Sequence, residues 1–195
     1  MKKTFIPSLI AILFMVMVLN SCSYLKELSA LADCDFRMST LEDPLLAGID
    51  ISDRNSIEAL TFEETGKIAK NILLGELPLS FILNVEVKNP NPVTASLNRL
   101  EYIAFIDDLQ VAAGAVEERI EIPPLGGIST IPVKVETNLV ELLKRESRNT
   151  LINFGLNLAD ASKRPTRVSI QIKPYIRVGN KDLEYPGYIN VNKEF

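Results

Sequence analysis

Apolar and polar residues alternate along several segments of this chain. Residues 81–87 show the period most clearly, with an apolar residue at every odd position. The same period of two recurs over residues 100–106, 131–135 and 168–172, and more weakly over residues 116–122. Because successive side chains of a strand point to opposite faces of a sheet, these segments are predicted to be half-buried strands.

Shorter segments complete the predicted β structure. Residues 36–38 and 45–49 have the composition of strands on either side of a predicted turn at residues 42–44, and residues 188–191 offer a last strand. Pro and Gly gather at residues 123–127, between two of the alternating segments. Short strands separated by turn residues favour a mainly β fold, a sandwich of antiparallel sheets.

Two segments have a helical pattern instead. Thr61 and Glu64 can satisfy each other's backbone amide groups at a helix start, and Gly75 suits a left-handed helix end. A second helix is predicted to begin at Asn138, with Glu141 three residues later. The apolar stripes of the two amphipathic helices are Ile68, Ala69, Ile72 and Leu73 in the first, and Leu139, Leu142, Leu143, Leu151 and Phe154 in the second.

The N-terminal segment has the pattern of an export signal. Lys2 and Lys3 precede an uninterrupted apolar run over residues 9–19. A permanent membrane span needs roughly 20 apolar residues, so a retained anchor is the weaker alternative. We therefore expect residues 1–21 to be a signal peptide.

The residues after this run, Leu19-Asn20-Ser21-Cys22, resemble the lipobox of bacterial lipoproteins. In that family the cysteine sulfur receives diacylglycerol and the signal is cleaved just before it, although Asn20 is bulkier than the usual occupant. The resemblance implies lipidation of Cys22 and an attachment to the membrane through this anchor. Two or three acyl chains on one residue hold a protein stably on a bilayer.

The resemblance also suggests a location and a domain organisation. Ser23 follows the anchor where many inner-membrane lipoproteins have aspartate. We therefore expect a protein of the bacterial cell envelope, on the periplasmic face of the outer membrane. Residues 22–34 are predicted to be a tether, and residues 35–195 a single globular domain.

Charge excludes one class of partner. Cleavage after residue 21 would remove Lys2 and Lys3 and take the formal net charge from −4 to −6. Nucleic-acid binding needs a basic face, so a nucleic-acid partner is not expected.

Cys34 would be the only thiol of the mature chain, so no internal disulfide is expected. It lies between Asp33 and Asp35, whose charges would raise the thiol pKa and lower its nucleophilicity. A buried structural thiol is the favoured interpretation, and pairing between molecules and catalysis are the alternatives.

The residue inventory removes most kinds of enzyme. The chain has no His, which excludes Ser-His-Asp and Cys-His catalysis and histidine-bound metals. The adjacent acidic pairs at residues 107–108 and 117–118 are interpreted as solvated charges, and no phosphate-binding loop is present. Residues 50–55 offer oxygen ligands for calcium but lack the glycine and the closing glutamate of a calcium loop. No catalytic residue, metal or cofactor is predicted.

Residues 79–92, LSFILNVEVKNPNP, resemble the signature of the late embryogenesis abundant type 2 family, also called the water stress and hypersensitive response domain. The resemblance covers residues 76–178. It implies an immunoglobulin-like or fibronectin type III-like sandwich with one or two helices and no catalytic residues. Members of that family are associated with desiccation and other stress.

The signature ends in Asn89-Pro90-Asn91-Pro92. Each proline removes an amide donor, and each asparagine side chain can bond neighbouring backbone groups, so the motif is interpreted as a strand terminator. A ligand site formed by the two asparagines is the alternative.

Two functions from different classes remain open. The first is a non-catalytic binding or scaffold lipoprotein, which recruits an envelope protein through exposed sheet edges or loops. The second is a periplasmic carrier that encloses a lipid or another amphiphile. The first is favoured because the alternating apolar residues leave no surplus to line a cavity.

Overall fold

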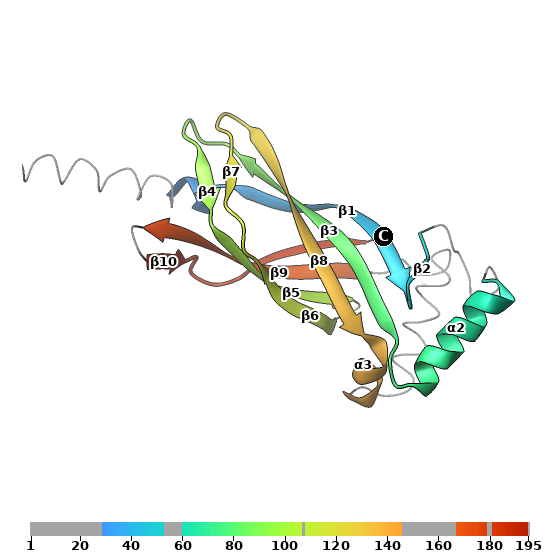
Figure 1. Cartoon of the computed structure of the whole chain (residues 1–195). Coiled ribbons are helices and arrows are strands. Elements are labelled where there is room, and N and C mark those ends of the chain that lie inside the picture. Colours follow the sequence, from blue (N-terminus) through green and yellow to red (C-terminus); the bar gives the residue numbers. More distant parts are fainter. Residues whose placement is uncertain (1–28, 53–59, 107, 146–166, 179–180, 195) are drawn as a thin grey trace, which may run out of the picture.

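The computed structural model describes residues 29–52, 60–106, 108–145, 167–178 and 181–194. Two antiparallel sheets make up the body of the domain (Figure 1). One sheet has the strand order β2-β1-β3-β8, and the other has the order β10-β9-β5-β6 with β11 also paired to β9. The mainly β, antiparallel sandwich expected from the sequence is confirmed.

The first sheet contains β1 (Asp35–Leu46), β2 (Ile49–Asp50), β3 (Pro78–Asn89) and β8 (Gly127–Asn138). The second contains β5 (Arg99–Ile106), β6 (Leu109–Val116), β9 (Arg167–Val178), β10 (Lys181–Glu184) and β11 (Ile189–Glu194). A separate pair is formed by β4 (Ala95–Leu97) and β7 (Ile120–Ile122), and the helices are α2 (Phe62–Leu73) and α3 (Leu139–Arg145).

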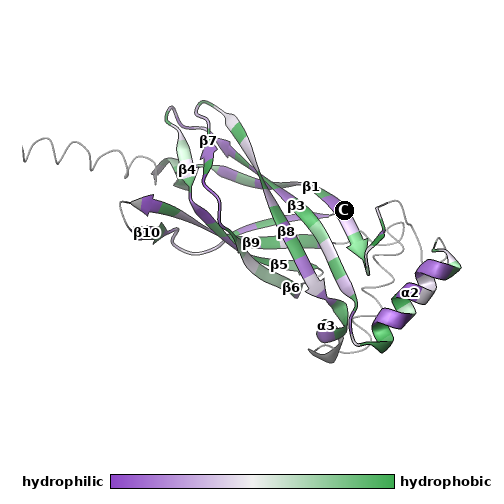
Figure 2. Ribbon diagram, viewed as in Figure 1, coloured by the Kyte–Doolittle hydropathy of each residue, from purple (hydrophilic) through white to green (hydrophobic). Residues whose placement is uncertain are grey.

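Strands β3 and β8 form the longest regular ladder, from the pair Pro78–Asn138 to the pair Asn89–Gly127. Their hydrophobic residues alternate with polar ones along both strands, as Figure 2 shows. The inward side chains are almost fully buried: Leu79, Phe81, Leu83, Val85 and Val87 on β3, and Ile131, Val133 and Val135 on β8. The alternation predicted for residues 81–87 and 131–135 is therefore confirmed.

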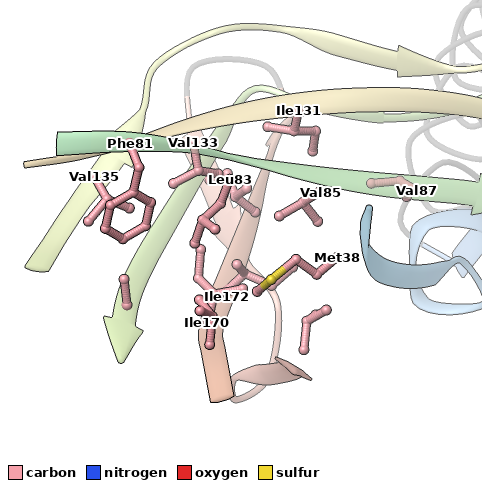
Figure 3. Close-up of a cluster of buried hydrophobic side chains, with 14 of the residues drawn as sticks. Met38, Phe81, Leu83, Val85, Val87, Ile131, Val133, Val135, Ile170 and Ile172 are labelled. Atoms are coloured by element: carbon pink, nitrogen blue, oxygen red, sulfur yellow. The ribbon is translucent and has the colours of Figure 1, made fainter. Parts of the chain in front are cut away.

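The second sheet covers this inner face. Ile170 and Ile172 of β9 lie across from Leu83 of β3, and Met38 of β1 packs beside them (Figure 3). The solvent-exposed fraction of Leu83, Ile170 and Ile172 is 0%. The space between the sheets is thus filled with aliphatic side chains, each of which contributes about 1.5–3 kcal/mol by burial.

The predicted turn at residues 42–44 was wrong. Strand β1 continues through this segment, and its pairing with β3 shifts register between Glu42 and Leu45. Asp43 has a φ of 50°, as an extra residue in a bulge can have. Pro44 is compatible with this position because a bulge does not need its missing amide donor.

The chain actually turns at Ala47 and Gly48, whose φ values are 52° and 71°. Leu46 pairs with Ile49 on either side, which makes a two-residue hairpin. Positive φ at both central residues is the signature of the type I′ turn, whose twist matches that of the strands.

The single strand predicted over residues 116–122 was also wrong. Val116 ends β6, which pairs with β5, and Ile120 begins β7, which pairs with β4. The weak alternation over residues 116–122 therefore came from the last residue of β6 and from β7, which are separate strands. Sequence alternation did not predict β4, β6 and β10, because these strands are short or rich in small and exposed residues.

Helix α2 has the predicted ends. Thr61 Oγ1 accepts from the Glu64 amide at 3.2 Å, and Glu64 Oε2 accepts from the Thr61 amide at 2.8 Å. At the other end Gly75 has a φ of 78°, and its amide and that of Glu76 donate to the carbonyls of Ile72 and Asn71. This is the Schellman arrangement.

Helix α3 begins where it was predicted. Asn138 Oδ1 accepts from the Val140 amide at 3.1 Å, and Leu139 and Leu142 are buried. Leu151 and Phe154 of the predicted apolar stripe lie outside the described residues, as does the side chain of Leu143.

The packed domain extends further toward the N-terminus than residue 35. Residues 29–32 are helical, and Ala30 and Leu31 are buried in the core cluster with Cys34. Of the segment expected to be a tether, residues 29–34 therefore pack against the sandwich.

The edge strand β8 of the first sheet and the edge strand β6 of the second sheet approach each other, and Tyr102 connects the two sheets there. The Tyr102 hydroxyl, from β5, donates to the Lys134 carbonyl of β8 at 2.7 Å. Its ring reaches this position by lying across Gly114 of β6, with which Tyr102 is paired. A Cβ at Gly114 would lie 2.7 Å from the Tyr102 hydroxyl oxygen, so no larger residue fits without moving the ring.

We predict that Gly114→Val lowers the free energy of unfolding by about 1–3 kcal/mol, because it displaces Tyr102 and breaks the link between the sheets. Tyr102→Phe should cost only about 0.5–1.5 kcal/mol, since it removes the hydrogen bond and leaves the packing. Urea unfolding measures both. Equal stability of Gly114→Val and the unaltered protein would contradict this role for the glycine.

Candidate functional site

Asn89 is the last residue of β3 and one of two buried polar residues among those described. Its side chain is fully buried and donates to the carbonyls of Val93 at 2.9 Å and Ile122 at 3.1 Å. Asn89 Oδ1 accepts from the Asn91 amide at 3.0 Å, which is an Asx turn. We call Asn89, Asn91 and the residues that they bond the Asn89 corner.

Asn91 extends the Asn89 corner to the N-terminal segment. Its side-chain amide donates to the Ala30 carbonyl at 2.9 Å and to Asn89 Oδ1 at 3.1 Å. The backbone carbonyls of Asn89 and Asn91 accept from the amides of Gly126 and Leu125 at 2.7 and 2.8 Å. The two asparagines thereby join three stretches of chain that are distant in sequence, at Ala30, at residues 89–93 and at residues 122–126.

The loop at residues 123–127 fits this corner closely. Leu125 and Gly126 both have positive φ, 57° and 86°. A Cβ at Gly127 would lie 2.5 Å from the Pro123 carbonyl oxygen, so the loop can close only with glycine there. The Pro and Gly cluster seen in the sequence is the second half of the Asn89 corner.

Cys34 lies next to the same corner and is buried, as predicted. Its Sγ–H donates to the Ala30 carbonyl at 3.2 Å, the oxygen that also accepts from Asn91. Burial raises the thiol pKa to about 11, and the charges of Asp33 and Asp35 contribute to the rise. A neutral, enclosed thiol is a poor nucleophile and a poor partner for a disulfide between molecules.

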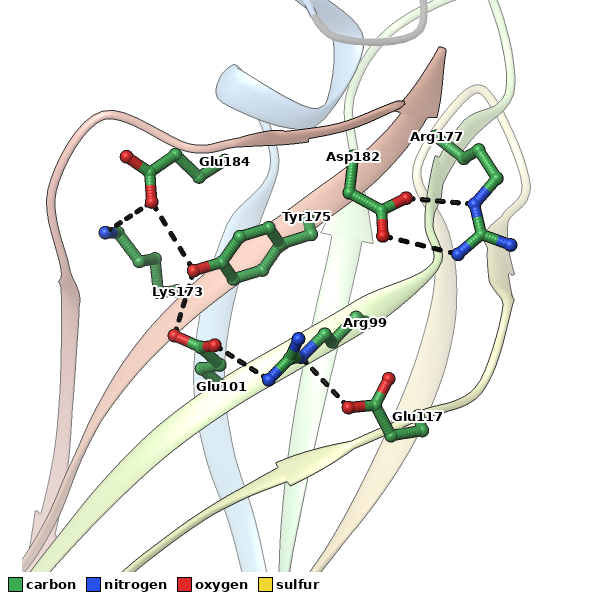
Figure 4. A network of polar contacts seen from close by, with 8 residues as sticks. All are labelled: Arg99, Glu101, Glu117, Lys173, Tyr175, Arg177, Asp182 and Glu184. Carbon is green, nitrogen blue, oxygen red and sulfur yellow. Dashed lines mark hydrogen bonds and ion pairs between the residues drawn. The ribbon is translucent and has the colours of Figure 1, made fainter. Parts of the chain in front are cut away.

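A second polar cluster covers the outer face of the second sheet, where residues of β5, β9 and β10 meet (Figure 4). We call it the outer-face network. Tyr175 lies at its centre and donates to Glu101 Oε2 at 2.9 Å, while the Arg99 guanidinium lies 5.4 Å from the centre of its ring. The remaining members are Glu117, Lys173, Arg177, Asp182 and Glu184.

The ion pairs of the outer-face network connect neighbouring strands. Lys173 Nζ donates to Glu184 Oε2 at 2.8 Å, and Arg177 contacts both carboxylate oxygens of Asp182, at 2.9 and 3.3 Å. Arg99 Nε lies 3.0 Å from Glu117 Oε1 and forms an ion pair without a hydrogen bond. The network therefore attaches β10, whose four side chains are all exposed, to β9.

Hydrogen bonds from the cations lower the carboxyl pKa values in this network. Lys173 has this effect on the pKa of Glu184, and Arg177 on the pKa of Asp182. Their contribution to stability is thus present above the usual carboxyl range and is lost as pH falls through the lowered pKa values. The pKa of Tyr175 is raised by desolvation and by its bond to Glu101. Each charged group is already paired, which is the pattern of a structural cluster.

The acidic pairs singled out in the sequence do not form a catalytic dyad among the described residues. Glu117 pairs with Arg99, and Asp108 pairs with Arg167, while Asp107 lies outside the description. No three His, Cys, Asp or Glu side chains in the described ranges come together as metal ligands. Asp50 Oδ1 accepts from the amide and the hydroxyl of Ser52, and residues 53–55 of the weighed calcium loop are not described.

Two surface hollows offer space for small molecules. One, of about 520 Å³, lies at the β1 bulge and is lined by Leu41, Glu42, Asp43, Pro44 and Ser52. The other, of about 230 Å³, lies between β6 and the start of α3. Neither hollow includes the Asn89 corner or the outer-face network.

The anchor predicted at Cys22 lies outside the described residues, as does the whole predicted signal peptide. Within the described ranges, the helices are all too short or too polar to cross a bilayer.

Comparison with known proteins identifies the family. The sequence model of the late embryogenesis abundant proteins (LEA_2) matches residues 84–185, more than half of the chain. This chain belongs to the late embryogenesis abundant type 2 family. The resemblance seen in residues 79–92 is thereby confirmed, and the matched region contains both the Asn89 corner motif and the outer-face network.

Two solved structures are similar to this member of the late embryogenesis abundant family. A crystal structure of a protein from Archaeoglobus fulgidus is 13% identical, covers 84% of this chain and 94% of its own, and has a TM-score of 0.35. The solution structure of a protein assigned to the late embryogenesis abundant (LEA) proteins is 8% identical, covers 97% of this chain and 87% of its own, and has a TM-score of 0.39. No curated protein matches the chain.

Membership of the late embryogenesis abundant family bears on whether the Asn89 corner and the outer-face network are catalytic sites. The family is generally non-enzymatic and is associated with stress. Sequence reasoning singled out Asn89 to Pro92 but missed the outer-face network, although Glu101 stands at an outward position of the strand predicted over residues 100–106 and Arg99 directly precedes that strand. Only the pairing of β5 with β9 places them beside Lys173, Tyr175 and Arg177.

We predict that Asn89→Ala lowers the free energy of unfolding by about 1–3 kcal/mol, because it leaves the Val93 and Ile122 carbonyls without their buried donor. Asn84→Ala, on the same strand, should change it by less than about 0.5 kcal/mol, since Asn84 bonds only Thr40 at an exposed position. Thermal or urea unfolding measures both variants. Normal melting of Asn89→Ala together with loss of a co-purifying molecule would favour the ligand-site alternative.

Cys34 gives a second prediction. Cys34→Ser should lower stability by around 1 kcal/mol, because a hydroxyl replaces a thiol in a packed site. At pH 8 the native thiol should react with iodoacetamide at least about a hundredfold more slowly than in urea, since its pKa is raised from 9.0 to about 11. Fast alkylation of the folded protein, or a reducible dimer that disappears in Cys34→Ser, would contradict the structural role.

Proposed function

We propose that this chain is a non-catalytic lipoprotein of the bacterial cell envelope, attached through acylated Cys22 and acting as a binding or scaffold domain. Its place is the periplasmic face of the outer membrane, and its role belongs with the stress-associated functions of its family. The partner is an envelope protein that contacts the outer surface of the sandwich.

The filled interior carries this proposal. Leu83, Val133 and Ile172 meet between the sheets with no exposed surface. A carrier for a lipid or another amphiphile would need an apolar cavity with room for the cargo, and pockets of this kind typically measure about 300–1,000 Å³. The hollow of about 520 Å³ at the β1 bulge has the size but lies on the surface, with the carboxylates of Glu42 and Asp43 in its lining. Close packing between the sheets leaves the outer surface for binding and makes the carrier the weaker alternative.

The sheet edges narrow the way in which a partner can bind. One end of the second sheet is β10, which has only four residues, three of them charged. Short, charged edges resist the addition of further strands. At this edge, recruitment through loops and exposed faces is therefore favoured over strand addition.

A crosslinking experiment in the intact envelope tests the binding role. The full chain is crosslinked in its own cells, recovered and analysed by mass spectrometry, while native mass spectrometry of the recovered protein detects bound lipid. A recurrent crosslink to one envelope protein supports the scaffold. A stoichiometric lipid that withstands purification would overturn it in favour of the carrier.

The anchor has its own test. Cys22→Ala should abolish labelling by alkynyl palmitate and leave the precursor uncleaved by the lipoprotein peptidase, because the acylated sulfur is missing. Cys34→Ala is the matched control and should label normally, since the second cysteine is buried in the folded domain. Labelling that persists in Cys22→Ala would show that the lipobox assignment is wrong.

A further inference from the structure

Helix α2 carries an apolar stripe that faces away from the domain. The exposed fraction is 97% for Phe62 and 88% for Leu73, and Ala69 between them is also exposed. At about 100° per residue, Phe62 and Leu73 project within about 20° of each other, so the three side chains lie along one line. Figure 1 shows α2 at the end of the sandwich opposite the β4–β7 pair.

The other side of α2 is the one that meets the domain. Ile68 is partly buried against the core, and Glu64 and Asn71 are half-buried. Lys67 Nζ lies beside the β1–β2 turn, 3.4 Å from the position that a Cβ would take at Gly48. An amphipathic helix normally turns its apolar stripe toward the core. Of the stripe predicted for α2, Ile68 meets the core, whereas Ala69, Ile72 and Leu73 are exposed.

The stripe has a pattern that is complementary to itself. Phe62, Gly66, Ala69 and Leu73 follow the 4-3-4 spacing of a coiled-coil seam, with large side chains at both ends and small ones in the middle. In an antiparallel pair of α2 helices, Phe62 of one copy meets Leu73 of the other. The small residues then meet at the centre, where the space beside Gly66 is open.

The charges beside the stripe fit the same arrangement. Glu63 in the first turn and Lys70 in the last turn project within about 20° of each other, so they lie on one flank of the stripe. A two-fold axis through an antiparallel pair brings that flank against itself. Glu63 of each copy then lies near Lys70 of the other, whereas in a parallel pair the two flanks would lie on opposite sides and these charges would not meet.

We infer that α2 is a self-association surface, on which a second copy of this chain docks its own α2 in the antiparallel direction around a two-fold axis. The surface is isologous, with the same patch on both copies. A single 12-residue helix buries less than the roughly 1,200–2,000 Å² of a standard stable interface, so the dimer is weak. The inference rests on α2 and is independent of the envelope partner proposed above.

Cysteine crosslinking in cells that produce the full chain tests this surface. Ala69→Cys places a thiol near the middle of the stripe, where two antiparallel helices would approach each other. Mild oxidation should yield a reducible dimer. Leu125→Cys is the matched control, because Leu125 is 80% exposed but lies in the loop of the Asn89 corner, and its dimer yield should be at least tenfold lower.

A charge exchange identifies the partner as a second copy. In the Ala69→Cys background, Glu63→Lys or Lys70→Glu alone should lower the dimer yield at least threefold, because each places like charges together across the axis. The two substitutions combined should restore the yield. Each substitution also weakens one end of α2. If fraying of the helix caused the loss of dimer, the combined variant would lose at least as much as the single ones, so recovery of its yield excludes fraying as the cause.

Three outcomes would overturn the inference. One is a dimer yield from Ala69→Cys no higher than that from Leu125→Cys. Another is a combined charge variant that stays as low as the single ones. The third is a thiol at residue 69 that is shielded from a water-soluble maleimide without forming a dimer, which would mean that a bilayer, another protein or another part of the chain covers the stripe.

Discussion

The register between β3 and β8 is the constraint on which the rest of the structure depends. Their ladder runs without a shift from Pro78–Asn138 to Asn89–Gly127, and a slip by one residue would turn every inward side chain to the outside. An asparagine closes each end. Asn138 Oδ1 accepts from the Leu77 amide at 2.9 Å at one end, and Asn89 bonds Val93 and Ile122 at the other.

The fixed register of β3 and β8 explains how the other elements pack against this ladder. With the register fixed, Leu83 and Val133 present a continuous apolar face that β9 covers, and the Asn89 corner holds residues 29–34 and the 123–127 loop against the same end. The side-chain amides of its two asparagines are bonded to backbone carbonyls there, so the corner stabilises chain crossings. The space between the sheets is then filled by apolar side chains, which is the observation that supports the proposed binding role.

In helix α2 the local sequence pattern predicts the two ends of the helix but not the direction of its apolar stripe. The capping box and the Schellman end form as Thr61, Glu64 and Gly75 dictate, because these contacts are local. The direction of the apolar stripe depends instead on tertiary placement, in which Ile68 packs against the core and Lys67 lies beside the β1–β2 turn. The outward stripe is the observation on which the inferred self-association surface rests.

The sequence by itself determined the features that depend on neighbouring residues: the strands at 81–87 and 131–135, the caps of both helices and the family signature. The tertiary structure decided the features that depend on distant residues. Strand pairing turned the predicted turn at residues 42–44 into a bulge, divided residues 116–122 between two sheets and assembled the outer-face network from β5, β9 and β10. It also joined Asn91 to Ala30, which are 61 positions apart in the chain. Alternation encodes which side chains are buried, but it does not encode which strand lies alongside, because many pairings bury the same residues equally well.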